Sequence, residues 1–133
     1  DDFMLQQCLF GEHQLHGDNI NNVVAIVESE KSALLGSLVY PDYTWLATCG
    51  KCNLTPYRTS ALVNRTVILF PDVDAYDEWK DKARHLFLPK KVIVSDLLQR
   101  CANDEERGRK IDIGDWLIDV LKASQSNPCA AWL

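Results

Sequence analysis

The sequence predicts an open α/β fold, in which a mainly parallel sheet of four to five strands carries helices on both faces. Four short runs of β-branched and other apolar residues lack polar alternation, as is typical of strands buried on both faces. The runs occupy residues 23–27, 44–48, 67–70 and 92–95. Each gap between them has room for a crossover helix and two short loops, so we expect parallel strands joined by right-handed crossovers.

The gaps between these runs carry helical signals. An apolar stripe over 33–38, closed by Pro41, predicts a helix after the first strand. Residues 53–62 are expected to form a short helix after the second strand, interrupted early by Pro56. After the third strand, apolar residues at helical spacing predict a helix over 76–86.

Two more helices are expected after the fourth strand. Residues 97–101 are predicted to be helical, and the polar stretch NDEERGRK follows them. The last helix is the clearest, because its apolar residues recur at i, i+3, i+4, i+7 and i+8. They are Ile113, Trp116, Leu117, Val120 and Leu121.

The chain of 133 residues has the length of one domain. We interpret residues 1–22 as an N-terminal extension with one additional strand over 8–10, and residues 23–124 as the domain itself. Residues 125–133 have no periodicity and are expected to form a loosely held tail. The first residue is Asp1, so we expect the domain to come from a longer protein with flanking domains.

Composition narrows the class of protein. Apolar residues make up 47% and charged residues 25%, which is typical of a globular domain, and no apolar run approaches the roughly 20 residues of a membrane helix. Acidic residues outnumber Lys and Arg by 19 to 14, so DNA or a nucleotide would be bound locally and not by a basic surface. The five cysteines are odd in number and scattered, which favours a reduced, cytoplasmic protein. The lack of a long apolar run argues against a membrane partner.

Acidic residues follow three of the four predicted strands. Glu28 follows the first strand, Asp72 and Asp74 follow the third, and Asp96 follows the fourth. The carboxyl ends of parallel strands meet at one edge of a sheet, where gathered carboxylates need a cation or a shared proton. Since carboxylate oxygens suit Mg²⁺ or Mn²⁺, we predict that Glu28, Asp72 and Asp74 bind such an ion for phosphoryl chemistry.

The segments that carry these carboxylates resemble the Toprim domain of bacterial primases and topoisomerases. VVAIVESEKSALL is similar to the Toprim strand that ends in a glutamate, and TVILFPDVDAY is similar to the later strand that ends in a D-x-D pair. The resemblance covers roughly residues 23–121. It implies that Glu28 acts as a general acid or base and that Asp72 and Asp74 hold Mg²⁺. Ser29 departs from the glycine that often follows the glutamate.

Two further segments extend the resemblance. LATCGK resembles the glycine-containing turn of primase-type members, and IDIGDWL is similar to the late acidic pattern of phage-type primase and helicase relatives. Asp112 and Asp115 are therefore additional acidic candidates, while Lys31 and Lys51 are candidates for binding substrate phosphate. The resemblance implies a primase-like nucleotidyltransferase or a DNA strand-cleaving module, of the kind encoded by bacteria and their mobile elements.

Simpler structural roles remain open for several of these residues. Asp74 is also placed to cap the helix that follows it, and Asp112 with Asp115 matches the pattern of a capping box. Cys49 and Cys52 form a single C-x-x-C pair, which is a weak signal for a zinc or redox site.

Three functions remain open. The favoured one is Mg²⁺-dependent nucleotidyl or phosphoryl transfer on DNA, as the Toprim resemblance implies. The second is a catalytically degenerate domain of the same fold that binds DNA or a replication partner. The third is a signalling receiver domain, which would use Asp72 and Ser95 but needs a fifth strand ending in lysine that we do not find after Ser95.

Overall fold

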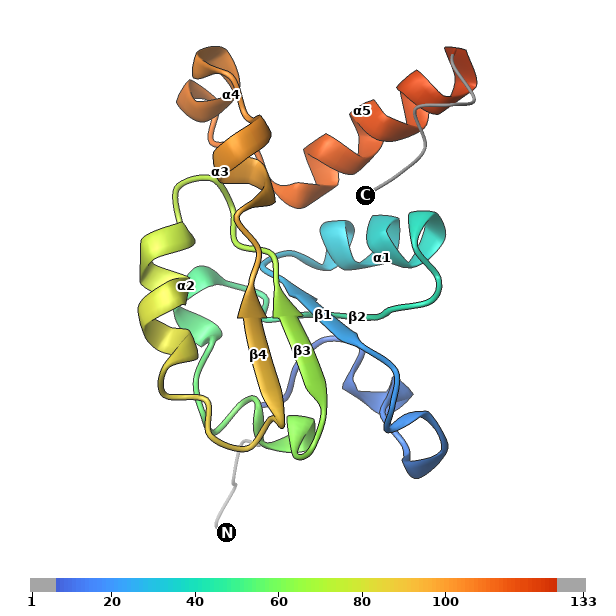
Figure 1. Cartoon of the computed structure of the whole chain (residues 1–133), viewed down its shortest axis with the longest axis vertical. Coiled ribbons are helices and arrows are strands. Elements are labelled where there is room, and N and C mark those ends of the chain that lie inside the picture. Colours follow the sequence, from blue (N-terminus) through green and yellow to red (C-terminus); the bar gives the residue numbers. More distant parts are fainter. Residues whose placement is uncertain (1–6, 127–133) are drawn as a thin grey trace, which may run out of the picture.

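The computed structural model describes residues 7–126 and contains a four-stranded, all-parallel sheet in the order β2-β1-β3-β4 (Figure 1). This confirms the predicted open α/β fold. The strands lie where the four apolar runs predict them: β1 (Val24–Val27), β2 (Thr44–Ala47), β3 (Thr66–Leu69) and β4 (Lys91–Val94).

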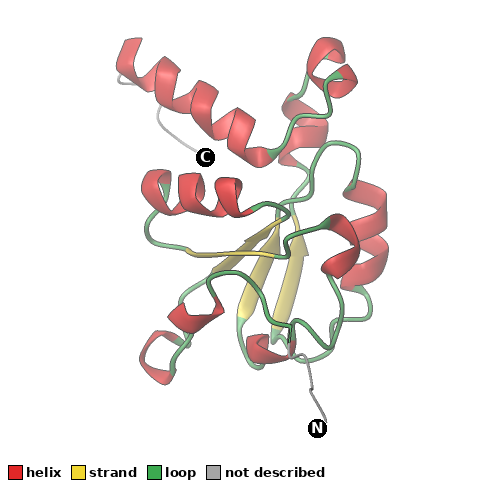
Figure 2. Ribbon diagram, turned by 180° about the vertical axis from the view of Figure 1, so that it is seen from behind, coloured by secondary structure: helices red, strands yellow, loops and turns green. Residues whose placement is uncertain are grey.

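Within residues 7–126, five α-helices accompany the sheet. Helix α5 lies along α1, which packs on β1 and β2, while α2 packs against β4 from the opposite face of the sheet (Figure 2). The α-helices are α1 (Glu30–Val39), α2 (Tyr76–Ala83), α3 (Leu97–Cys101), α4 (Asp104–Gly108) and α5 (Ile113–Ser126). Short 3-10 turns span Glu12–Gln14, Gly17–Asn19, Lys51–Asn53 and Ser60–Leu62.

The central strand β1 separates two hydrophobic clusters. Ala25 and Val27 face the cluster beneath α1 and α5, whereas Val24 and Ile26 face the cluster that contains Trp79 of α2. All four strand residues are fully buried because side chains alternate between two covered faces. This explains why the run lacks the polar alternation of a half-exposed strand.

The N-terminal extension does not form the predicted strand over 8–10. The backbone of Phe10 makes one antiparallel bridge to Ala47 on the outer edge of β2, with N···O distances of 2.8 and 3.1 Å. The chain then turns at Gly11, whose φ of 83° is a conformation that glycine adopts at little cost. The buried Arg65 fixes the extension further along, by donating hydrogen bonds to the carbonyls of His16 and Asn19.

Two connections differ from the sequence prediction. The helix expected over 53–62 is absent, and two separate 3-10 turns flank Pro56, which has no N–H to donate within a helix. The polar stretch after α3 instead contains α4, where Asn103 and Glu106 form a capping box. The tail expected over 125–133 lies outside the described residues from 127 onward.

The packing of α1 on β2 depends on a close approach. A Cβ atom at Gly36 would lie 2.3 Å from Cδ2 of Trp45, so only glycine fits there. The Trp45 indole also donates a hydrogen bond to the Tyr40 carbonyl and stacks on Phe70 with ring centroids 5.5 Å apart. Among residues 7–126, we find no helix with the length and apolar character that crossing a membrane requires.

Candidate functional site

The strand order places a topological switch point at the centre of the sheet. From β1 the chain crosses to β2 on one side, and β3 later pairs with β1 on the other side. Ligands of open α/β sheets bind beyond the carboxyl ends of the strands at such a point. Glu28 directly follows β1, and Asp72 comes three residues after the end of β3.

The structure brings these two carboxyl groups together. Burial raises the pKa of Asp72 to about 8, and a hydrogen bond to Glu28 and the negative charge of Glu28 add to the increase. The Oε2 atom of Glu28 is buried and lacks a hydrogen-bond partner within residues 7–126. Two adjacent carboxylates without a donor are unfavourable, so the pair requires either a shared proton or a cation.

Asp74 lies beside the pair but is engaged by two lysines. Its Oδ2 atom is 3.4 Å from Nζ of Lys51 and 3.7 Å from Nζ of Lys110, and the hydrogen bond and charge of Asp74 raise the pKa of Lys51. The charge of Asp74 contributes to the raised pKa of Asp72. Asp74 does not cap α2, because the N-cap position belongs to Ala75.

Asp112 and Asp115 form the reciprocal hydrogen bonds of a capping box at the start of α5. The amide of Asp115 donates to Asp112 at 2.8 Å, and the amide of Asp112 donates to Asp115 at 3.0 Å. Nζ of Lys31 lies 3.6 Å from a carboxylate oxygen of each. Asp112 also raises the pKa of Asp72 through its charge, so this group borders the carboxyl pair.

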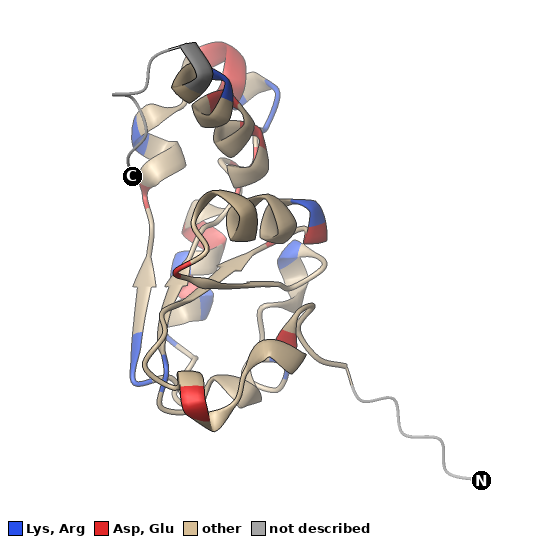
Figure 3. Cartoon of the chain, turned by 90° about the vertical axis from the view of Figure 1, so that its right-hand side faces the viewer, with Lys and Arg blue, Asp and Glu red and all other residues tan. Residues whose placement is uncertain are grey.

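The two candidate phosphate-binding lysines occupy different positions. Lys31 lies in the first turn of α1, where acidic and basic positions adjoin (Figure 3), and Lys51 lies in the turn after β2. The backbone carbonyl of Lys51 accepts hydrogen bonds from the Trp79 indole at 3.2 Å and from Nζ of Lys82 at 3.0 Å. These bonds hold the loop after β2 against α2, which positions the Lys51 side chain near Asp74.

The metal prediction can be compared with the arrangement of ligating side chains. Within the described part of the chain, no three or more His, Cys, Asp and Glu side chains are grouped as a metal site. Mg²⁺, however, is commonly bound through one or two carboxylates together with waters and substrate phosphates. The contact between Glu28 and Asp72 and the unpartnered Oε2 of Glu28 fit that smaller donor set.

Cys49 of the C-x-x-C pair is not an activated thiol. Burial, together with a hydrogen bond to Glu30 and the charge of Glu30, raises the pKa of Cys49 to about 11. The thiol therefore stays protonated near neutral pH, whereas nucleophilic and metal-ligating cysteines are thiolates. Cys49 and Cys52 are both free cysteines.

One basic partner of the site was missed by sequence reasoning. Lys110 follows the polar stretch after α3 and has a φ of 55°, and its side chain reaches Asp74 across a long sequence separation. Only the tertiary fold brings these residues together. The pairing of Lys31 with Asp112 and Asp115 is likewise non-local, although the capping box itself is visible as a D-x-x-D pattern.

Comparison with known proteins gives a family but no characterised relative. No curated protein and no solved structure matches the chain significantly. The family model described as a domain of unknown function, DUF6371, matches residues 1–73, which is more than half of the 133 residues and includes both Glu28 and Asp72. The chain therefore belongs to the DUF6371 family.

Proposed function

We propose that the chain is a Toprim-like module of a primase-related or DNA-processing protein, and that it supports Mg²⁺-dependent nucleotidyl or phosphoryl transfer on DNA. The observation that carries the proposal is the contact between Glu28 and Asp72 at the switch point of the sheet. Carboxylates held together at that position are suited to a divalent ion and a phosphate group.

The roles of the residues follow from their surroundings. Asp72 and Glu28 would hold Mg²⁺ or Mn²⁺, which when bound supplies positive charge to a substrate phosphate. Glu28 is the proposed general acid or base, since its buried oxygen lacks a donor from residues 7–126. Lys51 is positioned to bind phosphate oxygens. Its ion pair with Asp74, at 3.4 Å, is partly exposed, so a substrate phosphate can replace Asp74 as its partner.

The alternative is a catalytically degenerate domain that binds DNA or a replication partner. One observation favours it: Lys51 and Lys110 already neutralise Asp74, so this carboxylate is stabilised without an ion. In that case, the shared proton of Asp72 and Glu28 would also remain in the functional state.

Calorimetric titration with Mn²⁺ tests the proposal. The wild type is expected to bind with a dissociation constant of about 1 mM or tighter, and Asp72→Asn and Glu28→Gln should each abolish binding. The matched control is Asp42→Asn, because Asp42 is exposed and precedes β2, at the opposite end of the sheet. Absence of binding to the wild type, or unchanged binding to Asp72→Asn, would refute the metal site; DNA binding in that situation would support the alternative.

A further inference from the structure

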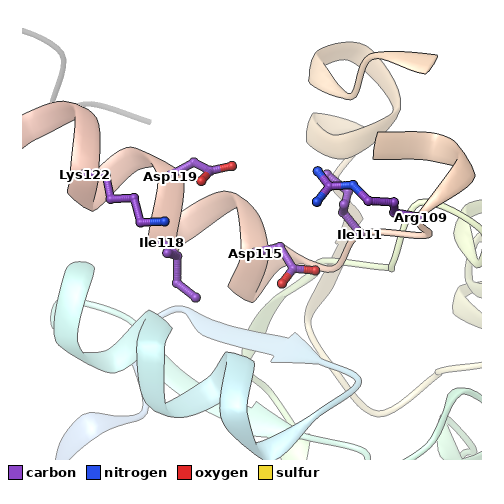
Figure 4. Close-up of a pocket in the computed structure, with 6 residues that line it drawn as sticks. All are labelled: Arg109, Ile111, Asp115, Ile118, Asp119 and Lys122. Carbon is purple, nitrogen blue, oxygen red and sulfur yellow. The ribbon is translucent and has the colours of Figure 1, made fainter. Parts of the chain in front are cut away.

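A second site is suggested by a cavity between α5 and the segment that follows α4. Its volume is about 420 Å³, which lies within the range of small-molecule sites. The lining consists of two cationic, two anionic and two apolar side chains (Figure 4): Arg109, Ile111, Asp115, Ile118, Asp119 and Lys122. Four of them come from α5 and recur at helical spacing on one face of it.

The charged groups of this cavity differ in their partners, since Asp115 already contacts Lys31 and accepts a hydrogen bond from the Asp112 amide. Within residues 7–126, the Arg109 guanidinium and the Asp119 carboxylate have neither a hydrogen bond nor an ion pair. Figure 4 shows Arg109 reaching toward α5, from which Asp115 and Asp119 project. Arg109 therefore leaves its donors available to a ligand, and Asp119 leaves its acceptor oxygens available.

The lining selects a ligand with two kinds of polar group. The planar guanidinium of Arg109 matches the oxygens of a phosphate. The carboxylates of Asp115 and Asp119 accept hydrogen bonds and therefore suit hydroxyl groups. Ile111 and Ile118 add apolar surface that suits the C–H face of a sugar ring.

We infer that this cavity binds the ribose-phosphate group of a sugar phosphate or nucleotide, independently of the carboxyl pair formed by Glu28 and Asp72. The phosphate lies against Arg109, and the sugar hydroxyls donate to Asp119 and Asp115. Two sources have this chemistry, a free sugar phosphate and a nucleotide, and they differ in the presence of a base.

NMR titration of the ¹⁵N-labelled protein without a divalent ion tests the inference. Ribose 5-phosphate should produce saturable shifts in backbone amides between 109 and 122, and Arg109→Gln should weaken binding about tenfold or more through loss of charge-assisted hydrogen bonds. Asp119→Asn should weaken binding of ribose 5-phosphate but not that of inorganic phosphate. Arg84→Gln is the matched control, because Arg84 is an exposed arginine on the far side of the sheet from α5.

The remaining titrations decide between the outcomes. Tighter binding of AMP than of ribose 5-phosphate indicates a nucleotide, and equal binding indicates a sugar phosphate. Binding that persists in Asp72→Asn separates this site from the proposed metal site, whereas its loss in that variant would contradict the independence of the two. The inference is overturned if ribose 5-phosphate causes no saturable shift, or if Arg109→Gln with an otherwise unchanged spectrum binds as the wild type does.

Discussion

Replacement of Asp72 by asparagine is expected to stabilise the protein, and increasingly so as the pH rises. The pKa of this carboxyl is raised from 3.8 to about 8, chiefly by burial and then by Glu28. Between these values the native state holds a proton that the unfolded state has released. The native state thus binds more protons than the unfolded state, so stability is greatest below the unfolded pKa and falls as the pH rises toward the native one.

The size of the effect follows from linkage. One extra proton bound by the native state lowers the free energy of unfolding by ~1.4 kcal/mol for each unit that the pH rises. The wild type should therefore lose about 3 kcal/mol of stability between pH 5 and pH 7 through Asp72 alone. Asparagine has the shape of the protonated acid and keeps a donor for Glu28, but it does not titrate. The stability advantage of Asp72→Asn should therefore grow by about 3 kcal/mol over the same interval.

Urea unfolding at a series of pH values measures this difference. Subtraction of the two curves isolates the contribution of position 72, including its coupling to Glu28. Asp42→Asn should follow the wild-type curve, because Asp42 is exposed at the other end of the sheet. The prediction is contradicted if the stability curves of the wild type and Asp72→Asn run parallel, or if the variant is less stable at pH 7. Either result would show that the pKa of Asp72 is not raised in the native state.

Two further substitutions test the packing and the basic partners of the site. Gly36→Ala places a Cβ atom 2.3 Å from the Trp45 ring and should lower the free energy of urea unfolding by about 3 kcal/mol. The control Gly108→Ala, whose added Cβ has no atom within 4 Å, should change stability by less than ~1 kcal/mol. Equal effects of the two substitutions would contradict the close packing of α1 on β2. Lys51→Gln should leave stability within ~1 kcal/mol of the wild type, because its ion pair is partly exposed, and should raise Mn²⁺ affinity about threefold by releasing Asp74. A weaker affinity would mean that Lys51 does not compete with the metal.

The four strands could be predicted from the sequence because burial on both faces leaves a local signal. In β1, four consecutive apolar residues are all buried, and no polar position interrupts them. The last helix was equally visible, since Ile113 and Leu117 at helical spacing are buried in the cluster beneath α1 and α5. In both cases, neighbouring residues in the chain carry the information.

The sequence prediction was wrong for the segment 53–62 and did not include helix α4. The segment 53–62 contains Pro56 and lacks an apolar stripe, so it forms two 3-10 turns instead of a helix. The helix α4 has no apolar stripe either, but the N-x-x-E pattern of Asn103 and Glu106 is a local signal that would have identified its start.

The candidate site was predictable in part. The switch-point rule and the strand ends are enough to bring Glu28 and Asp72 to the same edge of the sheet, where Glu28 helps to raise the pKa of Asp72. The partners of Asp74 could not be found in this way, because Lys51 and Lys110 reach it from loops whose conformations depend on the packing of α2 and α5.

The outer strand β4 has a consequence for association between copies of the molecule. Within residues 7–126 its outer side pairs with no further strand, so backbone donors and acceptors there are available to another chain. The strand begins at Lys91, preceded by Lys90, and basic positions are visible at its start (Figure 3). Two copies joined in parallel along this edge would place these ammonium groups side by side at the same end of the ladder, where like charges are destabilising. Charge repulsion therefore opposes parallel extension of the sheet, and acetylation of both lysines would remove that protection.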